Sequence, residues 1–150
     1  MVTPLRIIVV GLLAGLGSEV VLGILFANPV TMSVLYNPAI QGQAFLSVTP
    51  HRDLLASVTG LVVLSVIHAW LYVVLSASVP GRTWLRKGLS WGVFIWLMYW
   101  VFQEWFIYHT LLDEPYLLNA LELVLLLVGS LIEGMIIAFG FREPAADGIY

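Results

Sequence analysis

Four long apolar runs constrain this chain more than any other feature of its sequence. They cover approximately residues 5–27, 54–77, 88–112 and 116–141. Each has about 20 residues or more, the length that an α-helix needs to cross the hydrocarbon core of a bilayer. The sequence therefore predicts an all-α integral membrane protein, with four transmembrane helices in an antiparallel bundle. We expect the 150 residues to form a single domain with a short cytoplasmic tail over 142–150.

The composition supports a membrane location and excludes several classes of protein. Hydrophobic residues make up 61% of the chain and charged residues only 10%, against about 45–50% and 25% in ordinary soluble domains. Soluble enzymes, nucleic-acid-binding proteins and disordered chains are excluded on this ground, so we expect no nucleic-acid partner. The chain has no cysteine, which excludes disulfides, thiolate metal sites and cysteine nucleophiles.

The basic residues predict the orientation of the four helices. Five of the six lie at the amino end, in the second connection or at the carboxyl end, at Arg6, Arg82, Arg86, Lys87 and Arg142. With four spans these places share one side of the membrane, and an excess of Lys and Arg marks the cytoplasmic side. We therefore expect both termini to be cytoplasmic, in the plasma membrane of a bacterium or archaeon.

The first connection, residues 28–49, is the long one, and it lies on the outer side in this topology. It combines Asn-Pro and Thr-Pro break signals with apolar residues. We expect it to lie on the outer membrane surface or to fold back over the mouth of the bundle.

Acidic residues inside the predicted spans are the main functional signal. A charged side chain at the centre of a bilayer costs about 2.5–3.5 kcal/mol on insertion scales, so such residues should point into the bundle, be protonated or meet a partner. From the helical rise, Glu19, Glu104 and Glu122 lie about 9–12 Å below the outer edge. We expect these three to form one outer layer, with Glu133 and His68 deeper in the bundle. These five residues are our candidates for binding protons or cations.

The third run is rich in aromatic residues and suggests a lipophilic ligand. Trp96 and Trp100 lie near its middle, where an indole N–H needs an acceptor. Tyr108 and His109 lie near its outer end, and at 100° per residue His109 is about 140° from Glu104, so the two should not point at one spot. The alternative is packing against lipid or a partner subunit. We take Trp96, Trp100, Tyr108 and His109 as candidate ligand-binding residues.

We assign no metal site, cofactor or catalytic residue from the sequence. Carboxylate metal sites in helical bundles use Glu-x-x-His, whereas Glu104 and His109 are five residues apart. A hard cation held by Glu19, Glu104 and Glu122 remains an alternative.

Three functions remain open at this stage. The first is proton- or cation-linked binding or transport of a small or lipophilic molecule. The second is a non-catalytic subunit of a larger membrane complex, and the third is a membrane enzyme with a carboxylate or metal centre. The partners we expect are membrane lipids, further copies of the chain or other membrane subunits, and a lipophilic small molecule.

Overall fold

The structure, a computed structural model, describes residues 2–47 and 54–142. It is all-helical, with about 81% helix and no strand in the part described. The elements are α1 (Pro4–Phe26), α2 (Pro29–Leu35), α3 (Gln43–Ser47), α4 (Leu54–Leu75), α5 (Trp84–Ile95), η1 (Trp96–Trp100), α6 (Val101–Gln103), η2 (Glu104–Leu111) and α7 (Tyr116–Gly140). The predicted tail lies outside the described residues, apart from Arg142.

Three described helices are long and apolar enough to cross a membrane, judged by length and composition. They are α1, residues Val58–Leu75 of α4, and α7, and they match three of the four predicted spans. The remaining run is helical from Trp84 to Leu111, but it alternates between α and π hydrogen bonding. None of its separate elements is long enough to cross a membrane, so the fourth span stays a prediction.

The helices begin where the sequence supplies caps. Thr3 Oγ1 accepts a hydrogen bond from Arg6 N at the start of α1, with Pro4 as the first helical residue. Asn28 Oδ1 accepts from Val30 N at the start of α2, and Thr83 Oγ1 accepts from Arg86 N at the start of α5. Each bond satisfies an N–H group that has no partner within its helix.

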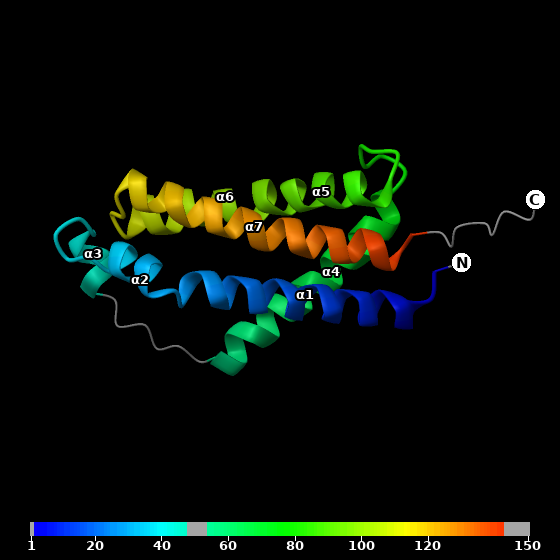
Figure 1. Ribbon diagram of the computed structural model, residues 1–150, viewed down its shortest axis with the longest axis horizontal. Coiled ribbons are helices and arrows are strands. Elements are labelled where there is room, and N and C mark those ends of the chain that lie inside the picture. Colours follow the sequence, from blue (N-terminus) through cyan, green and yellow to red (C-terminus); the bar gives the residue numbers. More distant parts are fainter. Residues whose placement is uncertain (1, 48–53, 143–150) are drawn as a thin grey trace, which may run out of the picture.

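The long helices run in alternating directions, and α1 and α7 are the central pair (Figure 1). Helix α1 packs between α4 and α7, and α7 packs between α1 and α5. Helix α4 crosses α1 and touches α7 only over a short stretch (Figure 1). The long helices are therefore not equally packed against one another, and α4 leaves much of its surface uncovered.

Glycines allow the closest helix crossings. A Cβ on Gly92 of α5 would lie 2.5 Å from Ser130 O of α7, and one on Gly88 would lie 2.8 Å from Met135 Cα. On α1, a Cβ on Gly11 would lie 2.5 Å from Val66 Cα of α4. Such small residues let helix backbones approach in membrane proteins. These contacts fix the spacing of α5 against α7 and of α1 against α4.

The first connection folds back over one end of the helices, where η2 turns into α7 (Figure 1). It contains α2 and α3, and Gln41 between them donates from Nε2 to Glu114 Oε1 at 2.7 Å. The rings of Tyr36, Phe45 and Tyr108 follow one another at centroid distances of 5.9 and 6.1 Å. This segment closes that end of the molecule with polar and aromatic contacts.

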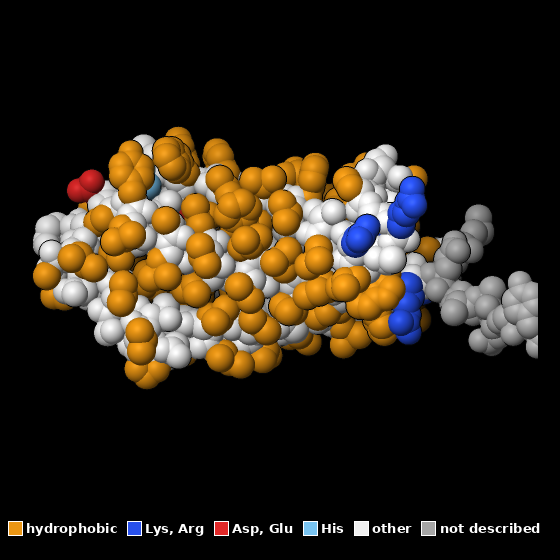
Figure 2. Space-filling model, turned by 45° about the horizontal axis from the view of Figure 1, so that its top comes forward, with side chains coloured by type: hydrophobic (Ala, Val, Ile, Leu, Met, Phe, Trp, Pro, Cys, Tyr) orange, Lys and Arg blue, Asp and Glu red, His pale blue; other side chains and the backbone are white. Residues whose placement is uncertain are grey.

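Apolar and charged side chains are separated on the surface. Figure 2 shows hydrophobic side chains along the length of the molecule, Lys and Arg gathered at one end and an acidic side chain at the other. The basic end is the one at which α1 begins and α7 ends (Figures 1 and 2). An apolar belt between charged ends is the surface expected of a chain in a bilayer.

Candidate functional site

Acidic residues that are buried or partly buried form two separate groups in the structure. We call Glu104, Glu114 and Glu122 the carboxyl cluster, and Glu19, His68 and Glu133 the histidine group. The carboxyl cluster lies toward the end covered by α2 and α3, and the histidine group lies deeper between the helices.

The carboxyl cluster brings together residues from η2, α7 and the turn between them. One carboxyl oxygen of each residue lies within 4.8 Å of the others. Their exposed fractions are 2% for Glu104, 0% for Glu114 and 7% for Glu122. The carboxyl groups of Glu104 and Glu122 are hydrogen-bonded to each other. Because an ionised carboxylate only accepts hydrogen bonds, a hydrogen bond between the two groups forms only when one of them is protonated.

Glu114 is the member of this cluster that the sequence did not indicate. It lies in the turn after Asp113, which has a φ of 56°, and Glu114 N donates to Tyr108 O at 3.0 Å. Gln41 holds Glu114 Oε1, whereas the buried Oε2 atom has no hydrogen-bond partner among the described residues. Burial raises the pKa of Glu114, and the hydrogen bond from Gln41 opposes that rise.

His109 contacts the backbone of Glu114 and is not among the residues whose ligand atoms meet in the carboxyl cluster. Its Nδ1 atom lies 2.7 Å from Glu114 O. The expectation that His109 and Glu104 do not point at one spot stays a prediction. The separation of 140° assumed α geometry, whereas Glu104–Leu111 is a π-helix. Its i→i+5 hydrogen bonds bring residues five apart onto nearly the same face.

Asn119 is a second residue that the sequence did not indicate. It is buried on the first turns of α7, and its Nδ2 atom donates to Glu104 O at 2.8 Å, with Glu104 Oε2 at 3.4 Å. It therefore ties the start of α7 to η2 and supplies a neutral donor beside the carboxyl groups.

The histidine group contains a side-chain contact between α4 and α7, which is an ion pair when His68 is protonated. His68 Nδ1 lies 2.8 Å from Glu133 Oε1, and the two side chains are 13% and 7% exposed. Glu19 on α1 lines the same cavity, which also touches Ser18, Ser65, Tyr99 and Trp100. The cavity volume of about 10 Å³ is close to the space that one water molecule needs. The cavity therefore has room for about one water molecule beside these side chains.

The structure places Glu19 in a different group from the one expected. It shares a cavity with Glu133 and His68 instead of meeting Glu104 and Glu122. The depth estimate assumed that all spans end at one level. Helix α1 ends at Phe26, and the chain continues through α2 before it reaches the turn near Glu114 (Figure 1). Glu19 therefore lies deeper than Glu104 and Glu122.

The four candidate ligand-binding residues are not brought to one place. Trp96 Nε1 donates to Leu123 O at 2.8 Å, which satisfies its indole within the protein. Trp100 lines the cavity of the histidine group. Tyr108 packs on Phe45, and the ring of His109 lies 3.8 Å from that of Tyr116. Of the four, Trp100 lies beside Glu19, His68 and Glu133.

No protein-family model, curated protein or solved structure matches this chain. The chemistry of the two groups is therefore the guide to function. Closely spaced carboxyl groups can share protons or hold a hard cation through their oxygens. A carboxyl–imidazole pair can accept and release a proton.

Proposed function

We propose that this chain is a four-span membrane protein that binds and exchanges protons, or a cation in their place, in linkage with a small or lipophilic molecule. The observation that carries the proposal is the contact between the Glu104 and Glu122 carboxyl groups in a buried cluster. Their hydrogen bond forms only when one of them is protonated, and a third buried carboxyl lies within reach. Loss of that proton leaves like charges side by side, unless a cation replaces it.

The fourth span and the topology belong to this proposal. The helical run from Trp84 to Leu111 follows a capped start and lies antiparallel to α7 (Figure 1). At about 1.5 Å per residue for the α parts, it has the length of the neighbouring helices. The basic end then faces the cytoplasm, and the carboxyl cluster lies toward the outer side.

The histidine group supplies a second proton-binding position between the carboxyl cluster and the cytoplasmic end. His68 and Glu133 face each other there, and Glu19 lines the same small cavity. Two such positions at different depths are what a stepwise proton path requires. Trp100 lines this cavity, whose volume of about 10 Å³ has room for a water molecule but not for a lipophilic ligand.

Infrared difference spectroscopy of the purified chain in liposomes tests proton exchange by the carboxyl cluster. We expect a carboxyl C=O band that titrates over roughly pH 5 to 9, the range in which groups of this kind act. The Glu104→Gln variant should fold and lose that band. Asp113→Asn is the matched control, because Asp113 is exposed on the neighbouring turn. A spectrum without a titrating band, or a band that Glu104→Gln leaves unchanged, would contradict the proposal.

The exposed aromatic face of the third predicted span favours a second candidate, a subunit role. Phe94, Phe102, Trp105 and Phe106 are each about half exposed or more, and α4 also leaves much of its surface uncovered. A partner subunit would cover these faces. Native mass measurement after gentle extraction distinguishes the two, because a fixed stoichiometry with other polypeptides supports the subunit role.

The three carboxyl oxygens of the cluster keep a metal-dependent enzyme as a third candidate. Elemental analysis of the purified chain tests it, since a metal centre predicts a stoichiometric divalent ion. A cation that is bound in exchange for protons, as the first proposal allows, should be displaced at low pH.

A further inference from the structure

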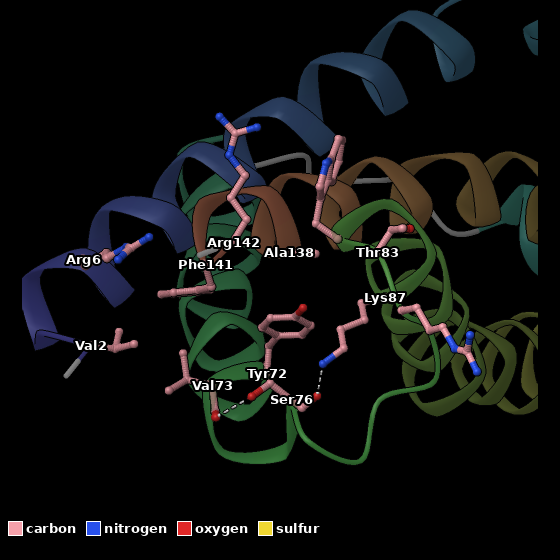
Figure 3. A pocket seen from close by; sticks show the side chains of 12 residues that line it. Val2, Arg6, Tyr72, Val73, Ser76, Thr83, Lys87, Ala138, Phe141 and Arg142 are labelled. Atoms are coloured by element: carbon pink, nitrogen blue, oxygen red, sulfur yellow. Dashed lines mark hydrogen bonds between the residues drawn. The ribbon is translucent and has the colours of Figure 1, made fainter. Parts of the chain in front are cut away.

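The basic end of the molecule contains a large cavity that belongs to neither acidic group. It has a volume of about 710 Å³, within the range of about 300–1,000 Å³ that is usual for ligand pockets. Its wall comes from α1, α4, α5, α7 and the turn between α4 and α5. Figure 3 shows Tyr72 and Lys87 projecting into the opening, with Arg6 and Arg142 at its rim.

Four cations line this cavity and no acidic residue does. They are Arg6, Arg82, Lys87 and Arg142. Among the residues that the structure describes, none of these cations forms an ion pair with a carboxylate. Positive charges gathered in a partly enclosed, low-dielectric space attract an anion more strongly than the same charges in water.

Two of the cations are held in place by backbone carbonyl groups. Arg6 donates from Nε and Nη2 to Gly140 O at 3.0 and 2.7 Å, at the carboxyl end of α7. Lys87 donates from Nζ to Ser76 O at 2.7 Å, just beyond the end of α4. These neutral acceptors orient the side chains without cancelling their charge. The Lys87 ammonium group has two further N–H donors.

The turn that carries Arg82 is also fixed. Gly81 has a φ of 130°, which a residue with a side chain rarely adopts. Thr83 caps α5 on the other side of Arg82. Arg82 makes no hydrogen bond to another described residue, so its planar donor group is available for a bidentate contact with a phosphate.

We propose that this cavity binds the phosphate-bearing headgroup of an anionic phospholipid from the cytoplasmic leaflet. The orange belt of apolar side chains reaches the basic residues at this end (Figure 2), and four of the basic residues of the chain line the cavity. Its wall also includes Val73, Trp84 and Phe141, which suit the apolar part of a lipid and not a free ion. Basic pockets between membrane helices at the cytoplasmic side have this lipid preference. This proposal rests on the topology given under Proposed function, in which the basic end faces the cytoplasm.

The test is lipid retention by the full chain in neutral detergent, measured by native mass spectrometry. Phosphatidylglycerol is the probe, phosphatidylcholine is the zwitterionic control and inorganic phosphate is the soluble competitor. We expect retention of phosphatidylglycerol over phosphatidylcholine, and no displacement by millimolar phosphate. Arg82→Gln should weaken retention about fivefold, because it removes a direct charge-assisted contact with the phosphate in the cavity.

Arg86→Gln is the matched control, because Arg86 lies at the same end but does not line the cavity. It should change retention less than twofold. Melting without lipid should be the same for wild type and both variants, since Arg82 makes no described contact that folding needs. Equal loss in the two variants would overturn the proposal, as would equal retention of phosphatidylcholine. Displacement of the lipid by phosphate would assign the cavity to a soluble anion instead. The lipid-retention result does not depend on whether the carboxyl cluster exchanges protons, so the two proposals can fail separately.

Discussion

The contact between His68 Nδ1 and Glu133 Oε1 connects α4 to α7, two helices that otherwise touch little. Removal of one partner leaves the other group without this hydrogen bond. We therefore expect His68→Ala to lower the free energy of unfolding by about 1–3 kcal/mol, the cost of leaving a buried polar group without its hydrogen-bond partner. Glu133→Gln keeps an oxygen that can accept from the imidazole and should cost about 1 kcal/mol. Unfolding in mixed micelles measures both, and equal losses would show that the charge of the pair contributes little.

Glu114 gives the stability of the protein a pH dependence with a defined sign. Burial raises its pKa in the folded state. Its contribution is then complete below the unfolded pKa of about 4.3 and is lost as the pH rises through the folded pKa. Glu114→Gln does not titrate, so the Tm of the wild type should fall relative to this variant as the pH rises from about 4. Asp113→Asn serves as the control. A Tm difference between wild type and Glu114→Gln that stays constant with pH would refute the assignment.

Sequence reasoning identified four of the five acidic residues in the two groups but not how they are divided. Glu104 and Glu122 were expected at one depth, and they are in contact. Glu114 was overlooked because a glutamate in an Asp-Glu-Pro turn normally faces water. Its burial depends on Gln41, which is 73 residues away in the chain. A contact at that separation leaves no periodic signal in the sequence.

At the scale of helices, the length of the apolar runs predicted where the chain is helical but not the hydrogen-bonding pattern of the third run. The predicted span over residues 88–112 lies within one helical stretch, yet 96–100 and 104–111 are π-helical. Neither stretch contains proline or glycine, so the usual marks of a distorted helix are missing. The change from α to π hydrogen bonding accompanies contacts with α7 that the sequence does not reveal. One of them is the hydrogen bond from Trp96 Nε1 to Leu123 O.

The crossing of α5 and α7 gives a direct test of helix spacing. Gly92→Ala would place a methyl group against Ser130 O, a backbone atom that cannot move without shifting α7. We expect a loss of about 1–3 kcal/mol in the free energy of unfolding, the usual cost of overpacking. Gly23→Ala is the control, because a Cβ there meets nothing within 4 Å. Equal effects of the two substitutions would mean that the α5–α7 contact is not tight.

At the scale of the whole molecule, the charge distribution was predictable and the helix arrangement was not. The basic residues gather at one end, as the positions of Arg6, Arg82 and Arg142 in the chain required (Figure 2). The central place of α1 and α7 and the exposed position of α4 follow from individual glycine contacts. Similar apolar helices could be packed in several orders, and composition does not choose among them.

The proposed topology can be tested directly because the chain contains no cysteine. Ala39→Cys and Ser78→Cys introduce single exposed thiols at opposite ends of the molecule. A membrane-impermeant maleimide should label Ala39→Cys in intact cells and Ser78→Cys only after permeabilisation. The reverse pattern would invert the orientation, and labelling of both variants in intact cells would rule out an odd number of crossings between the two positions.

The π-helical stretches have a consequence for how this protein can be compared with relatives. A π turn closes its hydrogen bond with one more residue than an α turn, so it is the structural equivalent of a one-residue insertion. A homologue with regular α geometry in this segment would be shorter there. An alignment without a gap between residues 96 and 111 would then pair Glu104 with the wrong position. A gap in that interval, rather than a substitution at Glu104, is the expected sign of a relative that keeps the same buried acid.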